Sequence, residues 1–217
     1  IIREAGVPIA APSANTSGRP SPTLAQYVAE DMEGSIEMIL DGGQVGIGLE
    51  STIVDLVDDV PTILRPGYIT EEMLSEILGR VDTDPTILSA DSDIAPKAPG
   101  MKYRHYAPKG ELTIIEGDLD AVIEYINKQA DKHETCGERV GIIATDNSVT
   151  SYDKGIVKSV GNRDEEETVA RELYRVLREF DDEGVTVIFS EAFERKGIGQ
   201  AIMNRLLKAA GHKVVKI

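Results

Sequence analysis

The stretch VTVIFSEAFERKGIGQAIMNRLLKAAGHKVVKI, residues 185–217, decides the fold class of the chain. Its pattern predicts a strand over 185–190, a helix over 200–210 and a closing strand over 213–217. The same alternation precedes it, with strands predicted over 112–116, 139–145 and 156–160 and helices over 119–132 and 164–180. Strands that alternate with helices indicate a mostly parallel sheet covered on both faces. We therefore expect a Rossmann-like parallel α/β domain over residues 111–217.

The first part of the chain, residues 1–80, predicts a smaller α/β unit built on a twisted sheet. The predicted strands cover residues 7–11, 36–40, 51–57 and 60–64. Asp58 and Asp59, between the last two strands, suit a tight turn, so we expect an antiparallel hairpin there. Thr23 and Thr70 are placed to cap two helices, the first over residues 24–32 and the second ending at Gly79.

Residues 81–110 differ from both units, because Asp, Ser, Pro and Lys dominate and no strand or helix period is present. We interpret this segment as the linker between domains. Within it lies PGMKYRHYAP, residues 99–108, which is more aromatic and more basic than a spacer in so acidic a chain requires. We expect this stretch to dock onto another part of the protein.

Charge and composition limit the function classes that fit the chain. Asp and Glu number 38 against 23 Lys and Arg, a net charge of -15 that repels a polyphosphate backbone, so direct tRNA binding is not expected. A small anionic ligand is still compatible, through local amide dipoles and one or two basic side chains. The sequence shows no long apolar run and no signal-peptide pattern, which predicts a cytoplasmic protein without a membrane span. Cys136 is the only cysteine, so no internal disulfide is expected.

The loop APSANTSGRPSPT, residues 11–23, is the first candidate for chemistry. It joins a predicted strand to a predicted helix, which is where open sheets place ligands. Gly18 and the short hydroxyl and amide side chains suit close approach to phosphate oxygens. A Ser- and Pro-rich surface turn explains the same composition, and the residues alone leave both interpretations open. Arg65, at the end of a predicted strand, suits either a fork onto phosphate or simple solvation.

Three other patterns are set aside. The glycine-rich stretch 42–48 is not followed by the Gly-Lys-Ser/Thr of a triphosphate-binding loop. The GIG at 197–199 lacks the third glycine and the following acidic residue of a dinucleotide motif, and helix packing explains it better. His105, His133 and His212 lie too far apart in the sequence for a local metal motif, so we predict no metal site in the protein's own residues.

Three motifs together carry a resemblance to a known family. They are PSAN, SG and PSPT within residues 12–23, ESTIVD at 50–55 and LRPG at 64–67. In order and spacing they resemble the YrdC-like family of threonylcarbamoyl-adenylate synthases. The linker stretch 99–108 and AIMNRL at 201–206 are similar to the long, two-domain form of that family. The resemblance implies that residues 1–80 are the C-terminal part of the catalytic domain, 81–110 a linker and lid, and 111–217 a C-terminal domain.

The resemblance also implies an activity and its substrates. The family condenses L-threonine with bicarbonate and joins the product to AMP, so that ATP is consumed, pyrophosphate leaves and threonylcarbamoyl-AMP forms. Mg²⁺ is expected to accompany ATP. The product would pass to a tRNA-modifying threonylcarbamoyl transferase complex, as the first step of threonylcarbamoyladenosine modification.

Site residues follow from the same resemblance. Ser13 and Ser21 would contact the ATP phosphates with Asn15 supporting their loop, Arg65 would bind the anionic portion of the nucleotide, and Tyr103 or Tyr106 would close over it. The backbone of Ala11 and the hydroxyl of Ser51 would bind threonine. No catalytic residue is assigned, because displacement at phosphorus needs positioning and charge neutralisation more than a strong base.

The chain departs from the family in one respect. A Lys-x-Arg element that would grip the triphosphate belongs upstream of the loop and is not in this sequence, which starts at Ile1 without Met. We therefore expect the chain by itself to be an inactive part of an enzyme.

Two other functions stay open. The basic and aromatic linker would fit an RNA-binding regulatory module, and the ATP loop would fit a maturation enzyme that forms a different carbamoyl-adenylate.

Overall fold

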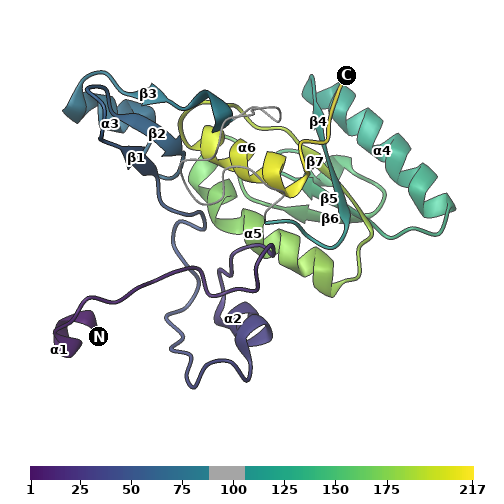
Figure 1. Cartoon of the computed structure of the whole chain (residues 1–217). Helices are drawn as coiled ribbons and strands as arrows, with labels where there is room; N and C mark the ends of the chain where they lie inside the picture. Colours follow the sequence, from purple (N-terminus) through teal and green to yellow (C-terminus); the bar gives the residue numbers. More distant parts are fainter. Residues whose placement is uncertain (88–105) are drawn as a thin grey trace.

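The computed structural model describes residues 1–87 and 106–217, and its C-terminal part is an α/β domain (Figure 1). A five-stranded sheet has the order β6-β5-β7-β4-β8, and each neighbouring pair is parallel. Its strands are β4 (Glu111–Glu116), β5 (Val140–Ala144), β6 (Ile156–Ser159), β7 (Val187–Glu191) and β8 (Val214–Lys216). The predicted parallel sheet is confirmed, with small shifts of the strand ends.

Successive strand residues point to opposite sides of this sheet, and apolar residues lie on both sides. Helices therefore cover both faces. On one face Ile115 and Ile142 share a core with α4 (Leu119–Thr135). On the other face Ile114 and Ile143 share a core with α5 (Glu166–Asp182) and α6 (Gly197–Ala209). If β4 is counted as the first strand of this domain, the order is 3-2-4-1-5. A dinucleotide-binding sheet has the order 3-2-1-4-5-6, so the two topologies differ. The predicted parallel sheet with helices on both faces is present, but the Rossmann-like topology predicted for it is not, because the strand order differs.

The N-terminal part contains a three-stranded sheet in the order β1-β2-β3. Strands β1 (Ile53–Asp55) and β2 (Thr62–Arg65) form the predicted antiparallel hairpin, and β3 (Asp82–Thr83) pairs with β2 in parallel. Helix α3 (Glu71–Leu78) begins as predicted, because Thr70 Oγ1 accepts a hydrogen bond from the backbone N–H of Met73 at 3.4 Å. Both β3 and the short 3₁₀ helix η1 (Pro85–Ile87) lie within the segment predicted as linker, so the sheet reaches into that segment. A second 3₁₀ helix, η2 (Val149–Ser151), follows β5.

Two predicted strands and one predicted cap are wrong. Residues 7–11 and 36–40 form no strand, and their apolar side chains are largely exposed, Met38 by 72%. A strand needs a neighbour for its backbone hydrogen bonds, and neither segment pairs with another among residues 1–87 and 106–217. Helix α2 (Ala25–Met32) forms, but its N-cap is Leu24, and the buried Thr23 hydroxyl makes no hydrogen bond with the described residues. The N-terminal segment with α1 (Ile2–Ala5) extends away from the two sheets in Figure 1, and the chain returns to α5 just before α2.

Candidate functional site

Glu50 joins three parts of the chain that are far apart in sequence. It follows the glycine-rich stretch and precedes β1. One carboxylate oxygen accepts a hydrogen bond from Ser21 Oγ at 2.7 Å. The other accepts from Arg205 Nε of α6 at 2.8 Å and from the hydroxyl of Tyr174 of α5 at 3.0 Å. The loop predicted to bind ATP therefore meets both helices of the C-terminal domain at one carboxylate.

Arg205 is almost completely buried, with 1% of its surface exposed. A buried guanidinium needs hydrogen-bond acceptors for its N–H groups, and this one has several. Besides the Glu50 carboxylate, it donates to Asn204 Oδ1 at 2.9 Å and to the backbone carbonyl of Glu50 at 3.4 Å. Asn204 in turn donates to the carbonyl of Ile87 at 2.8 Å, beside the N-terminal sheet.

The charge of Arg205 determines the protonation state of Glu50. Burial raises the pKa of the Glu50 carboxyl, but the Arg205 charge and the hydrogen bonds from Ser21 and Arg205 outweigh it, so the pKa lies below its ordinary value. Glu50 is therefore ionised near neutral pH and only accepts hydrogen bonds. The proton of Ser21 points at Glu50, so a bond from this hydroxyl to an ATP phosphate requires that the proton turn away from the carboxylate.

Arg65 and Ser51, predicted to bind ATP and threonine respectively, are in contact. Arg65 Nε donates to the carbonyl of Ser51 at 3.0 Å, and its Nη2 to the Ser51 hydroxyl at 3.4 Å. Gly67 permits this approach, since a Cβ there would lie 2.5 Å from the backbone N of Thr52 and 2.7 Å from the carbonyl of Glu50. The LRPG turn and the EST segment therefore pack backbone against backbone, and no side chain larger than hydrogen fits between them.

Tyr106 reaches the same cluster, but its ring is 3% exposed. It stacks on Tyr174 with ring centroids 5.2 Å apart, and the Arg205 guanidinium lies 5.9 Å from its centroid. Its backbone φ of 63° is in the left-handed region, which costs a residue other than glycine about 1–3 kcal/mol and persists only where packing enforces it. Burial and the Glu50 charge raise the pKa of Tyr106 despite Arg205 and Arg65. The buried ring offers no open face to a nucleotide, and Tyr103 lies outside the described residues.

The loop that contains Asn15 is held at Pro20 by a second buried arginine, Arg178. The Asn15 amide donates to the carbonyl of Thr16 at 2.8 Å, which fits its predicted role as a support of the loop. Arg178 of α5 donates to the carbonyl of Pro20 at 2.6 and 2.9 Å and to Asp31 at 2.7 Å. Asp31 also accepts from the backbone N–H of Thr16 at 3.1 Å. The C-terminal domain thus holds the predicted ATP loop at Pro20 directly, through Arg178, and at Ser21 indirectly, through Glu50 and Arg205.

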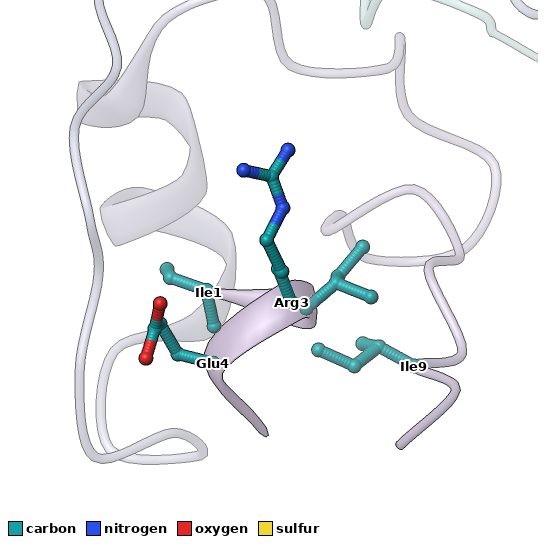
Figure 2. Close-up of a pocket in the computed structure, with 5 residues that line it drawn as sticks. Ile1, Arg3, Glu4 and Ile9 are labelled. Carbon is teal, nitrogen blue, oxygen red and sulfur yellow. The ribbon is translucent and has the colours of Figure 1, made fainter. Parts of the chain in front are cut away.

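Ser13 and Ala11 do not join the cluster. Both are exposed, on the extended segment before α2. A hollow of about 900 Å³ next to this segment is lined by Ile1, Ile2, Arg3, Glu4 and Ile9 (Figure 2). All five lining residues are exposed. This hollow is a surface feature that contains none of the predicted site residues.

The glycine-rich stretch 42–48 is largely exposed, and of its glycines only Gly48 lies closely against α5. At Gly48, with φ of 80°, a Cβ would collide with the backbone of Ala170 and Arg171. Its glycine is therefore explained by helix contact and not by phosphate binding. Within residues 1–87 and 106–217 no cluster of three metal-ligating side chains exists, and no helix is long and apolar enough to cross a membrane.

Sequence reasoning missed the residues that organise the site. Arg205 and Lys208 lie three positions apart on α6, and Arg178 lies on α5. All three are buried charges on helix faces that otherwise bury mainly apolar side chains, apart from Asp181 of α5 and Asn204 of α6. Their one signal was a basic residue within an apolar stretch, as in AIMNRLLKAA. That pattern also fits a basic side chain on the solvent face, so it did not identify them.

Comparison with known proteins gives two family matches. A family model described as "Threonylcarbamoyl-AMP synthase, C-terminal domain" matches residues 69–211, and one described as "Telomere recombination" matches residues 1–67. A Bacillus subtilis threonylcarbamoyl-AMP synthase is 46% identical over 216 residues, which cover 100% of this chain and 61% of that protein. The protein of that name from Pyrococcus abyssi is 46% identical over 97% of this chain and 60% of its own length.

Solved structures agree with these relatives. Pyrococcus abyssi Sua5 complexed with L-threonine matches with a TM-score of 0.89 and 43% identity, over 100% of this chain and 62% of that one. A variant of the same protein, with an adjacent histidine and tyrosine changed to alanine, matches with a TM-score of 0.90 at 43% identity, over 60% of its length. The chain thus spans about three fifths of the length of these relatives.

Proposed function

The chain belongs to the threonylcarbamoyl-AMP synthase family, and we propose that the complete gene product makes threonylcarbamoyl-AMP from ATP, L-threonine and bicarbonate. The observation that carries this proposal is the contact of Arg65 with Ser51 beside the Glu50–Ser21 pair. This contact places the Arg65 guanidinium, which is suited to bind phosphate, next to the Ser51 hydroxyl, which is suited to bind an amino acid. The complex of Pyrococcus abyssi Sua5 with L-threonine supports threonine as a ligand.

The reaction joins two steps. The amine of threonine takes up bicarbonate with loss of water to give N-carboxythreonine. A carboxylate oxygen of this carbamate then attacks the α-phosphorus of ATP. A new O–P bond forms, the bond between the α-phosphorus and its bridging oxygen breaks, and pyrophosphate leaves with the electron pair. Arg65 is suited to neutralise the phosphate charge, and Ser51 to hold the threonine part. We assign no residue as a general base.

Mg²⁺ enters this proposal as part of the substrate MgATP. The described residues contain no cluster that could hold the ion by itself, so the phosphate oxygens would carry it. Ser13, Asn15 and Ser21 are proposed for the phosphate side and the backbone of Ala11 for threonine. Tyr103 is proposed as part of a lid formed by the linker 81–110 beyond β3 and η1, between a catalytic unit over 1–80 and a parallel α/β domain over 111–217, whereas the Tyr106 ring is buried against Tyr174.

The product is proposed to go to a tRNA-modifying threonylcarbamoyl transferase complex in the cytoplasm. The net charge of -15 fits an enzyme that passes on a small molecule and does not hold tRNA itself. An RNA-binding module would instead show a salt-dependent affinity for RNA.

The test is to incubate the complete gene product with ATP and bicarbonate and to measure pyrophosphate with and without threonine. We expect pyrophosphate release that requires threonine. In a third incubation carbamoyl phosphate replaces threonine, and pyrophosphate release only there would support the alternative carbamoyl-adenylate chemistry. No pyrophosphate release with threonine would overturn the proposal.

A further inference from the structure

The Glu50–Ser51 segment is held by one arginine from each half of the chain. Arg65 of β2 binds the carbonyl and the hydroxyl of Ser51. Arg205 of α6 binds the carboxylate and the carbonyl of Glu50. The two residues predicted to face the two substrates, Ser21 and Ser51, therefore depend on a segment whose position α6 controls.

We propose that Arg205 is a positioning residue for the reaction, which holds Glu50 and, through it, the Ser21 hydroxyl and the Ser51 backbone where ATP and threonine bind. This inference rests on the proposed function. Arg205 itself has 1% of its surface exposed, so it acts through Glu50 and does not touch substrate. The C-terminal domain would then be part of the catalytic unit and not only a support for the linker.

The geometry favours arginine over any other residue at this position. Nε binds the Glu50 carboxylate, Nη1 the Asn204 side chain and Nη2 the Glu50 carbonyl. A planar guanidinium presents these donors in a fixed fork, whereas a lysine ammonium is a single point and reaches fewer of them. The Glu50 carboxylate oxygen bound by Arg205 also accepts from Tyr174, so the hydroxyl of Tyr174 gives an independent way to disturb the same group.

Charged and titratable groups surround Glu50 from each element packed on it. Arg205 and Lys208 come from α6, Tyr174 from α5, Tyr106 from the segment before β4, and Arg65 from β2 through its contact with Ser51. Burial raises the pKa of Glu50, and Arg205 is the main charge that lowers it. Without Arg205 the pKa therefore rises. A protonated Glu50 accepts the Ser21 hydrogen bond less strongly than the carboxylate does, so Ser21 is held less firmly as the pH falls.

The test compares Arg205→Gln, Arg205→Lys and Tyr174→Phe in the complete gene product. Arg195→Gln is the control, because Arg195 is also an arginine of the C-terminal domain that pairs with a glutamate, but its partner is Glu116 at 3.2 Å and not Glu50. The readouts are kcat/KM for ATP and for threonine from pH 5.5 to 9, ATP affinity by calorimetry, and circular dichroism.

We expect Arg205→Gln to lower kcat/KM for both substrates about ten- to hundred-fold, as for a lost hydrogen bond to a charged group. Its acid limb should move to higher pH. Arg205→Lys should keep the wild-type acid limb but recover only part of the rate. Tyr174→Phe, which keeps the ring, should move the acid limb upward by less, and this variant decides the matter if Arg205→Gln does not fold. Arg195→Gln should behave as wild type.

Folded Arg205→Gln and Tyr174→Phe with wild-type rates, ATP affinity and pH profile would overturn the inference. Failure of the proposed function is a different result, in which wild type forms no threonine-dependent product. In that case, a loss of ATP affinity in Arg205→Gln and Tyr174→Phe but not in Arg195→Gln supports the positioning role alone. Wild-type ATP affinity in Arg205→Gln and Tyr174→Phe rejects the positioning role as well.

Discussion

Replacing Arg178 by Met should destabilise the protein by about 3 kcal/mol, because it removes the arginine from a fully buried ion pair. The side chains of Arg178 and Asp31 are both 0% exposed and are joined at 2.7 Å. Removing one partner of a buried pair costs about 3–5 kcal/mol. The lower end applies here, since Asp31 keeps the Thr16 N–H and Arg19 as partners, while the Pro20 carbonyl loses its two bonds.

The assay is urea unfolding followed by circular dichroism, together with a thermal melt. For a chain of this size, about 3 kcal/mol corresponds to a fall in Tm of roughly 6–12 °C. Arg175→Met is the matched control, because Arg175 is on the same helix and pairs with Glu172 and Glu179 near the surface, where such pairs contribute about 0–1 kcal/mol. If Arg178→Met loses no more stability than Arg175→Met, the argument that this arginine clamps the ATP loop is wrong.

Three further predictions concern single side chains. Arg65→Ala should raise the KM for ATP far more than that for threonine in steady-state kinetics, and an effect on threonine alone would contradict the assignment. Ser51→Ala should raise the threonine requirement about ten- to hundred-fold, whereas a loss of affinity only for ATP in calorimetry would reject it. Burial, then Arg205 and Arg65, lower the pKa of Lys208 to about 8 from its ordinary 10.5, so its charge costs stability at neutral pH. Lys208→Met should therefore gain about 1–3 kcal/mol at pH 7. Wild-type stability rises between about pH 8 and 10.5, as the unfolded chain keeps a proton that the folded chain has lost, so the gain should shrink there. A gain that does not depend on pH would show that packing, and not charge, is responsible.

The sequence allowed the C-terminal sheet to be predicted because each of its elements carries its own local pattern. The helix over 164–180 and the strands around Ile142 and Ile188 were recognisable from periodicity, and their pairing follows from the strand–helix alternation. The strands over 7–11 and 36–40 had an equally good apolar pattern. They failed because a strand depends on a neighbour, which no local pattern supplies.

The candidate site was predictable only in part, for a related reason. The motifs around Ser21, Ser51 and Arg65 were found, since each is compact in sequence. Glu50, the residue that connects them, has no role that its motif alone predicts, because its partner Arg205 is 155 residues away. A buried arginine and a solvated one give the same letter in an amphipathic helix. Only the packing of α6 against the N-terminal part distinguishes them.

The most direct test of the account uses isotopic bicarbonate. The complete gene product is incubated with ATP, threonine and either ordinary or ¹³C-labelled bicarbonate, and the adenylate product is examined by mass spectrometry. We expect a threonine-containing adenylate whose mass rises by one unit with the label, in the fragment that carries the threonylcarbamoyl group. An adenylate of threonine without the label, or pyrophosphate release with no threonine-containing adenylate, would contradict it.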